Sequence, residues 1–142
     1  MVSYTTRAGT AVFGLLFYFY PVFNQSAVTT VTTTFTSNVA TTGSGGVMYV
    51  FSNNLYVSVI NGMFQYNSTL GGSRSGGAAY FWDSNSGLVL SGCQMIGNKS
   101  QQYGGGLSLV SAHGGVQISS CQFVRNTAGS AGGSVSMETS IV

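Results

Sequence analysis

Residues 104–126 read GGGLSLVSAHGGVQISSCQFVRN, and this stretch decides the fold. It opens with a glycine cluster, continues through two short strand-like segments and closes on Phe-x-x-Asn. The same order recurs, whole or in part, elsewhere in the chain, and the closing residues are Asn38, Asn67, Asn98 and Asn126. These asparagines lie 29, 31 and 28 residues apart. A near-constant period of this length indicates a stacked-repeat architecture.

Other positions repeat relative to each closing asparagine. Ten residues before it the side chain is always apolar, at Val28, Val57, Leu88 and Val116. Three residues before it the side chain is again apolar, at Phe35, Phe64, Met95 and Phe123. Six to nine residues after it a glycine pair begins, at Gly45-Gly46, Gly76-Gly77, Gly105-Gly106 and Gly132-Gly133. Each copy therefore has apolar positions at fixed places between glycine-rich turns.

The repeating units are of the β type. They are rich in Val, Tyr, Phe and Thr with two-residue alternation, and Gly, Asn and Ser separate the segments. One such unit cannot bury its apolar face alone, but units stacked in register bury a continuous core. We therefore predict an all-β, parallel β-helix of about four coils with 28–31 residues each. A β-sandwich or an irregular solenoid is the competing interpretation.

Gly76-Gly77-Ala78-Ala79, together with the Phe-x-x-Asn tetrapeptides, resembles the polymorphic outer membrane protein repeat. That family has GGA[ILV] and FxxN motifs and occurs in secreted adhesins and autotransporter passengers. The resemblance covers about residues 28–142 and implies a right-handed, pectin-lyase-like β-helix. This sequence departs from the pattern at Ala79, which is smaller than the family's aliphatic residue, and at Met95, which replaces Phe.

The N-terminal residues 1–27 have a composition of their own. Arg7 precedes the apolar run AGTAVFGLLFYFYPVF, which predicts a cleaved secretory signal peptide. An N-terminal hydrophobic anchor is the first alternative, although the 16-residue run is shorter than the roughly 20 residues that span a bilayer. A buried N-terminal segment is the second. We expect residues 28–142 to form the β-helix, with the last coil incomplete.

The composition excludes several classes of function. Charged residues make up only 4% of the 142 residues, which suits neutral ladders between coils because stacked like charges repel. Four scattered cations give no nucleic-acid footprint. The two acidic residues, Asp83 and Glu138, occupy different repeat positions about two coils apart, so they do not form a catalytic carboxylate pair. We expect neither catalysis nor a cofactor or bound metal.

Two further motifs have alternative interpretations. Asn24, Asn67 and Asn98 begin N-glycosylation sequons. However, Asn67 and Asn98 are also repeat anchors, and we favour a structural ladder of asparagine side chains. Cys93 and Cys121 share one repeat position on adjacent coils, which predicts either a pair of stacked buried thiols or, less favoured, a disulfide.

The strand after each glycine pair supplies the candidate binding surface. Counting four residues past each pair predicts an inward row of Val50, Phe81, Val110 and Met137. Alternation then sends four aromatic residues outward, namely Tyr49, Phe51, Tyr80 and Trp82. The same count places Leu109 and Ser111 outward in the next coil, so the aromatic cluster ends there. Such a cluster suits contact with sugar rings or with a surface protein.

These features together predict a structural or adhesive protein that is secreted or displayed at the cell surface. Its lateral face would contact carbohydrate or protein, and its only membrane contact would be through the N-terminal segment. The alternative is a self-assembling filament or scaffold subunit that stacks through open β-helix ends, since an uncovered coil exposes unpaired backbone groups. A fragment of a larger adhesin is a third possibility.

Overall fold

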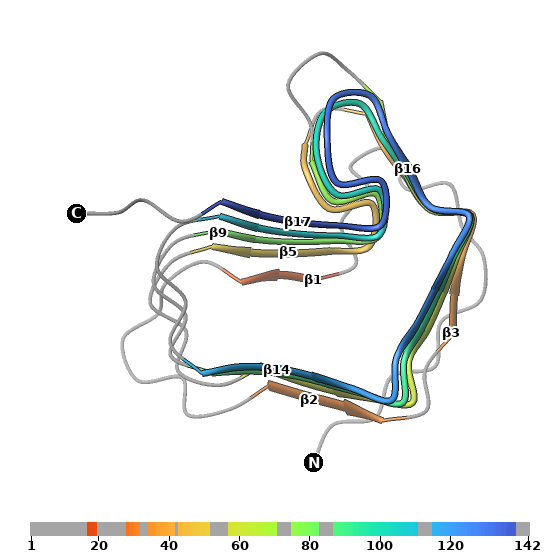
Figure 1. Cartoon of the computed structure of the whole chain (residues 1–142). Helices are drawn as coiled ribbons and strands as arrows, with labels where there is room; N and C mark the ends of the chain where they lie inside the picture. Colours follow the sequence, from red (N-terminus) through yellow and green to blue (C-terminus); the bar gives the residue numbers. More distant parts are fainter. Residues whose placement is uncertain are drawn as a thin grey trace.

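The chain folds as a stack of β coils. The computed structural model describes residues 17–19, 28–31, 34–41, 43–51, 57–70, 75–82, 87–110 and 115–138. Regular secondary structure in these residues consists of seventeen short strands. They form four parallel sheets, and each full coil contributes one strand to every sheet (Figure 1).

We name the sheets A to D. Sheet A contains β1 (Phe17–Phe19), β5 (Met48–Phe51), β9 (Ala79–Trp82), β13 (Leu107–Val110) and β17 (Val135–Glu138). Sheet B contains β2 (Val28–Val31), β6 (Val57–Ile60), β10 (Leu88–Ser91) and β14 (Val116–Ser119). Sheet C contains β3 (Thr34–Thr36), β7 (Met63–Gln65), β11 (Gln94–Ile96) and β15 (Gln122–Val124). Sheet D contains β4 (Val39–Ala40), β8 (Ser68–Thr69), β12 (Lys99–Ser100) and β16 (Thr127–Ala128).

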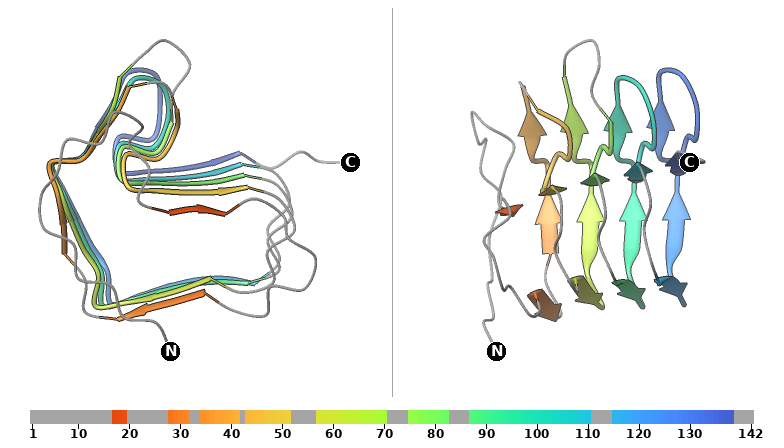
Figure 2. Two further views of the ribbon diagram at one scale, coloured as in Figure 1. Left: turned by 180° about the vertical axis from the view of Figure 1, so that it is seen from behind. Right: turned by 90° about the vertical axis from the view of Figure 1, so that its left-hand side faces the viewer.

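Every strand pairs in parallel with its counterpart one coil away. In sheet B, for example, Leu88 aligns with Val57 on one side and Val116 on the other. The right-hand view of Figure 2 shows the coils side by side along a single axis. This arrangement confirms the predicted parallel β-helix, and the predicted number of about four coils is close to what the structure shows.

The Phe-x-x-Asn motif marks the corner between sheets C and D. The residue before each closing asparagine has a left-handed backbone, with φ of 57° at Ser37, 54° at Tyr66, 64° at Gly97 and 53° at Arg125. A residue in this conformation turns the chain sharply between two short strands. The motif therefore recurs because every coil needs the same corner.

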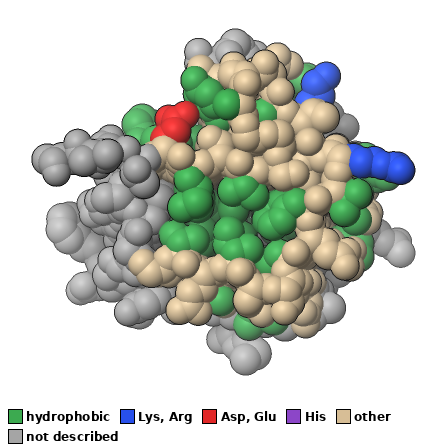
Figure 3. Space-filling model, viewed as in Figure 1, with side chains coloured by type: hydrophobic (Ala, Val, Ile, Leu, Met, Phe, Trp, Pro, Cys, Tyr) green, Lys and Arg blue, Asp and Glu red, His purple; other side chains and the backbone are tan. Residues whose placement is uncertain are grey.

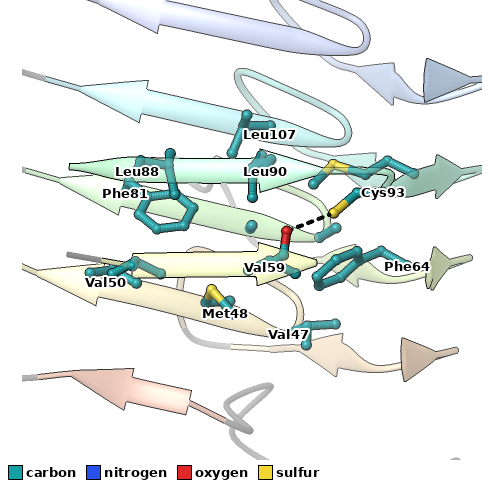
Figure 4. Packing of buried hydrophobic residues seen from close by; sticks show 14 of the residues in the cluster. Val47, Met48, Val50, Val59, Phe64, Phe81, Leu88, Leu90, Cys93 and Leu107 are labelled. Atoms are coloured by element: carbon teal, nitrogen blue, oxygen red, sulfur yellow. Dashed lines mark hydrogen bonds between the residues drawn. The ribbon is translucent and has the colours of Figure 1, made fainter. Parts of the chain in front are cut away.

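The core lies inside the coils, between sheets A, B and C. Alternation along the strands sends one set of apolar side chains inward, where Phe81, Leu90, Met95 and Leu109 are at most 1% exposed. Figure 4 shows Phe81 and Leu90 within this cluster. Side chains from equivalent positions stack along the axis, as the rings of Phe35 and Phe64 do at a centroid distance of 5.0 Å. Because each coil covers the next, a thin repeat buries large side chains completely.

The glycine pair of the third coil differs from the prediction by one residue. Gly104, with φ of 57°, takes the left-handed position that Gly45, Gly76 and Gly132 take in the other coils. The pair is therefore Gly104-Gly105. The triplet Gly104-Gly105-Gly106 fits the pattern in two frames, and the requirement for a left-handed first residue selects the earlier one.

This shift changes which residues of β13 point inward. Leu109, at 1% exposure, aligns with Phe81, whereas Val110 is partly exposed and aligns with Trp82. The prediction that Val110 points into the core was therefore wrong. Predicting Leu109 outward was wrong for the same reason.

The segment predicted to be a signal peptide or anchor contains β1. This strand pairs in parallel with β5 and aligns Phe17 with Met48 and Phe19 with Val50. It thereby adds a fifth strand to sheet A, at the edge beside the first full coil (Figure 2). Among the described residues, no helix is long and apolar enough to cross a membrane. The assignment of residues 1–27 as signal or anchor stays a prediction.

Candidate functional site: an aromatic row on sheet A

The candidate site lies on the outer face of sheet A. Along β9, Ala79 and Phe81 are buried in the core, while Tyr80 is half-buried and Trp82 is 41% exposed. The register of β5 with β9 aligns Tyr49 with Tyr80, and Phe51 with Trp82. We call Tyr49, Tyr80 and Trp82 the aromatic row; the side chain of Phe51 lies outside the described residues.

The rings of the aromatic row are in contact. Tyr49 and Tyr80 stack nearly parallel, with centroids 5.3 Å apart and 5° between their planes. Tyr80 meets Trp82 edge to face, with centroids 6.4 Å apart and 61° between planes. The Tyr49–Tyr80 pair joins two strands and so stabilises the sheet, while the contact between Tyr80 and Trp82 lies within β9. The row is therefore an ordered surface on a rigid support.

The glycine turn beside sheet A borders the row. A side chain on Gly76 would lie 2.9 Å from the Tyr80 Cβ, and φ is +67° at Gly76. The turn packs close to the tyrosine and limits its access to water. Burial, with smaller contributions from Tyr49 and Glu138, raises the pKa of Tyr80 to about 12. The Tyr80 hydroxyl is protonated at neutral pH, as in any tyrosine, and the raised pKa extends this hydrogen-bond donor into the alkaline range.

The row loses its aromatic character in the next two coils. Ser108 and Ser136 align with Tyr80, and Val110 and Glu138 align with Trp82. Ser108 is fully buried, and its hydroxyl has no hydrogen-bond partner among the described residues. The sequence prediction missed Ser108 and Val110 because of the one-residue shift in the third coil. Gly132 follows Asn126 by six residues, and Gly104 follows Asn98 by the same number. This equal spacing could have identified Gly104-Gly105 as the glycine pair of the third coil.

The four closing asparagines form the predicted ladder. The Nδ2 of Asn98 donates to Asn126 Oδ1 at 2.9 Å and to the Phe64 carbonyl at 2.9 Å. Its backbone N–H donates to the same Oδ1 at 3.0 Å. Asn67 makes the equivalent three bonds to Asn98 and Phe35. The ladder thus explains the asparagine of Phe-x-x-Asn, whereas the first residue contributes a backbone carbonyl to the ladder and an apolar side chain to the core.

This ladder bears on the predicted glycosylation sites. Asn67 and Asn98 are fully buried, and each Nδ2 already donates two hydrogen bonds. A glycan on either Nδ2 would replace one of its two hydrogens and so break at least one of these bonds at a buried position, and the geometry therefore favours the structural role. Asn24 lies outside the described residues. Glycosylation of the three sequons stays a prediction.

The two cysteines are neighbours on adjacent coils, as their spacing predicts, and both are free thiols. The Cys93 backbone N–H donates to Cys121 Sγ at 3.3 Å, and Cys93 Sγ donates to the Val59 carbonyl at 3.3 Å (Figure 4). Cys93 is fully buried, while Cys121 is partly exposed. Burial is the main cause that raises the pKa of Cys93 to about 11. The Cys93 thiol is therefore unreactive at neutral pH.

The described residues contain no group of three or more His, Cys, Asp and Glu side chains able to bind a metal ion. Glu138 is exposed at the end of the row, and Asp83 lies outside the described residues. No protein-family model, curated protein sequence or solved structure matches the chain. The function must therefore be argued from the geometry of the solenoid itself.

Proposed function

We propose that this chain is a structural, adhesive β-solenoid, secreted or displayed at the cell surface, whose aromatic row binds carbohydrate. The single observation that supports this most is the pairing of an ordered Tyr49–Tyr80 stack with a Trp82 side chain that is 41% exposed. Exposed aromatic side chains held on a rigid sheet are suited to stacking against the apolar faces of sugar rings.

The surroundings of the row favour a neutral ligand. Charged residues are scarce along the whole chain, and among the described residues only Glu138 carries a negative charge. The Tyr80 hydroxyl, whose pKa is raised to about 12, offers a neutral donor next to the exposed indole. A neutral oligosaccharide supplies the matching hydroxyl acceptors, whereas a strongly charged protein partner would find little electrostatic complementarity here.

The adhesive role also draws on the repeat pattern. The Gly-Gly-Ala-Ala and Phe-x-x-Asn motifs resemble those of the polymorphic outer membrane protein repeat, whose members are secreted adhesins and autotransporter passengers. The parallel β-solenoid is the architecture that this resemblance implies. We extend it to this chain as a proposal for surface display and for contact through the lateral face.

Trp82 provides a direct test because it is the only tryptophan in the chain. We would screen the full chain on an array of neutral oligosaccharides and follow the strongest binder by tryptophan fluorescence and calorimetry. We expect Trp82→Ala to weaken that binding about tenfold or more, as truncation of a central aromatic contact does. Trp82→Phe should restore part of the affinity.

Tyr66 gives a matched control. It is an aromatic side chain that is 61% exposed, and it lies at the corner between sheets C and D, away from the aromatic row. Tyr66→Ala should leave sugar binding unchanged. Full binding by the Trp82→Ala variant, or equal loss in Tyr66→Ala, would rule out the aromatic row as the site. Binding of a protein but of no sugar would move the ligand class from carbohydrate to protein.

A further inference from the structure

A second exposed aromatic ring lies at the corner between sheets C and D. Tyr66 is 61% exposed, and it belongs to a coil in the middle of the stack. Its backbone is left-handed, with φ of 54°, and its N–H donates to the Ile96 carbonyl of the next coil at 2.9 Å. The corner thereby fixes the direction in which this side chain leaves the coil. The ring is separate from the aromatic row, which lies on sheet A.

The glycine of the next coil sets the position of this ring. Gly97 occupies the same corner one coil further on, and a Cβ there would lie 2.7 Å from both Cδ1 and Cε1 of Tyr66. The ring therefore fills the space that a side chain at residue 97 would take. Gly97 is in turn paired with the following coil, since its N–H donates to the Val124 carbonyl at 2.8 Å. The ring thus leans along the stack toward the next corner residue, Arg125.

Two cations border the ring. Arg125 is exposed at the corner position one coil beyond Gly97. Lys99 lies two residues after Gly97 at the start of β12, where it is exposed while Ser100 is buried. Because neighbouring coils are about 4.8 Å apart, the ring and the two cations come from within about 10 Å along the stack. In Figure 3, the Lys and Arg side chains in view project from the side of the molecule where β16 lies.

The charge at this corner is positive. The strand partners of Lys99 in sheet D are Ser68 and Thr127, which are both neutral. Glu138, the only carboxylate side chain that the structure describes, belongs to β17 of sheet A. An anionic group at this corner therefore meets two positive charges, and no described carboxylate competes with it.

The surface beside the ring is partly apolar. Ile96 and Val124 align on the outer face of sheet C, where Ile96 is partly exposed and Val124 is 42% exposed. A ring and aliphatic groups next to two cations suit a ligand with an apolar face and an anionic substituent, and a sugar ring with a carboxylate or sulfate has both. Sites for single-stranded nucleic acid combine several stacking residues with a basic groove along the backbone, whereas two cations suit one anionic group.

We propose that the corner formed by Tyr66, Lys99 and Arg125 binds one anionic sugar unit of an acidic polysaccharide. The sugar ring lies against Tyr66, and its carboxylate or sulfate lies between the two cations. We call this surface the corner site. It differs from the aromatic row in its sheets and in the charge of its ligand, and it does not require the aromatic row to bind sugar.

The experiment uses the full chain and calorimetry with a sulfated heparin tetrasaccharide, an unsulfated hyaluronan tetrasaccharide and neutral cellotetraose. We expect at least one acidic probe to bind. Its affinity should fall severalfold when NaCl rises from about 50 to about 300 mM, because salt screens exposed charges. Binding of the sulfated probe alone identifies sulfate as the recognised group, and equal binding of both acidic probes identifies carboxylate.

Variants of the corner locate the bound sugar. Tyr66→Ala should weaken binding of the acidic probe about tenfold, as loss of a central aromatic contact does. The double variant Lys99→Gln/Arg125→Gln should weaken it about fivefold or more at low salt. Trp82→Ala is the matched control, because it removes an exposed aromatic ring from sheet A and should leave this affinity unchanged. If Tyr66→Ala lowers the midpoint of unfolding, Tyr66→Leu removes the ring and keeps apolar bulk.

Several outcomes would overturn the corner site. They are the absence of binding by both acidic probes, full affinity in the folded Tyr66 variants, and full affinity in the double cation variant. Loss of the acidic probe in Trp82→Ala but not in Tyr66→Ala would assign that ligand to the aromatic row instead. A single-stranded oligonucleotide that binds more tightly than either acidic sugar, with the same response to the corner variants, would overturn the ligand class. Neutral-sugar binding through Trp82 is measured separately, so either site can fail without the other.

Discussion

The third coil and the last described coil have nearly the same pattern but different environments. Leu88, Leu90, Met95 and Leu109 of the third coil are at most 1% exposed. Their register partners in the last coil are Val116, Ile118, Phe123 and Met137. All four are apolar and inward, yet each is partly or fully open to solvent.

The difference shows that burial in this fold is not set by a coil's own sequence. Two-residue alternation decides which side chains point inward, but a neighbour on both sides decides whether they lose contact with water. Stability in such a stack is a sum of coil and nearest-neighbour interface terms. Equivalent substitutions in the two coils should therefore have different effects, and the size of each difference measures one interface term.

The largest difference is expected for the second glycine of the pair. Gly77→Ala would place a Cβ 2.1 Å from the Gly105 carbonyl oxygen and 2.7 Å from the Lys99 backbone, so the coils must separate. We expect a loss of about 4 kcal/mol in the free energy of unfolding, or failure to fold. Gly133→Ala, with its closest contact at 3.4 Å, should cost less than about 1 kcal/mol. Urea denaturation of both variants measures the contrast, and equal losses would contradict it.

The core positions should show the next largest difference. Leu90→Ala leaves a cavity in a fully enclosed site and should cost about 3 kcal/mol. Ile118→Ala removes a side chain that is already 37% exposed, so the cost should be less than half as large. Denaturant midpoints with unchanged m-values would establish both numbers. A cost for Ile118→Ala equal to that of Leu90→Ala would mean that Ile118 is covered in solution.

Much of this architecture was predictable because ladders repeat a local requirement. Asn67 and Asn98 each donate to a carbonyl one coil back and follow a left-handed corner, so the asparagine recurs. The apolar residue three positions earlier recurs because its side chain stacks in the core, as Phe35 does on Phe64. The stacking of Cys93 on Cys121 followed from the same period. Because the repeat length is nearly constant, one correct alignment of two copies predicts the contacts between all neighbouring coils.

The errors arose where the pattern permits two frames. Three consecutive glycines at residues 104–106 satisfy the same rule, and only the left-handed backbone at Gly104 separates them. The wrong frame moved Val110 into the core and concealed the alignment of Ser108 with Tyr80. The pairing of β1 with β5 was not predicted either, because an apolar run after an arginine has the composition of a signal peptide whether or not it also forms a strand.

The cysteine pair allows the third and last coils to be compared through the pH dependence of stability. Burial raises the pKa of Cys93 from 9.0 to about 11, so the folded chain keeps a proton that the unfolded chain has lost. The stabilisation is complete below about pH 9 and disappears as pH rises toward 11, a change of about 3 kcal/mol for two pKa units. Unfolding free energies from pH 8 to 11.5 should fall accordingly in the wild type, and less steeply in Cys93→Ala.

Tyrosine ionisation must be separated from this effect. Tyr80, whose pKa is raised to about 12, destabilises the fold by the same logic between about pH 10 and 12. The variant Tyr80→Phe removes the loss of stability that comes from tyrosine ionisation and leaves the loss that comes from the Cys93 thiol. Native-state alkylation offers a second readout, in which the partly exposed Cys121 should react well before the buried Cys93. Equal labelling rates would show that the two coils are equally open.

The smallest expected effect concerns the corner before the closing asparagine. Arg125 adopts a left-handed backbone with φ of 53°, at a cost that glycine avoids, while its counterpart Gly97 has φ of 64°. Arg125→Gly should stabilise the fold by about 0.5 kcal/mol, since the relief of strain exceeds the added entropy of the unfolded chain. Gly97→Ala should destabilise it by about 1 kcal/mol or more, because its Cβ would also lie 2.7 Å from the Tyr66 ring. If Arg125→Gly instead lowers stability, the exposed arginine must contribute an interaction that outweighs its strained backbone, and the last coil would be held by more than its single interface.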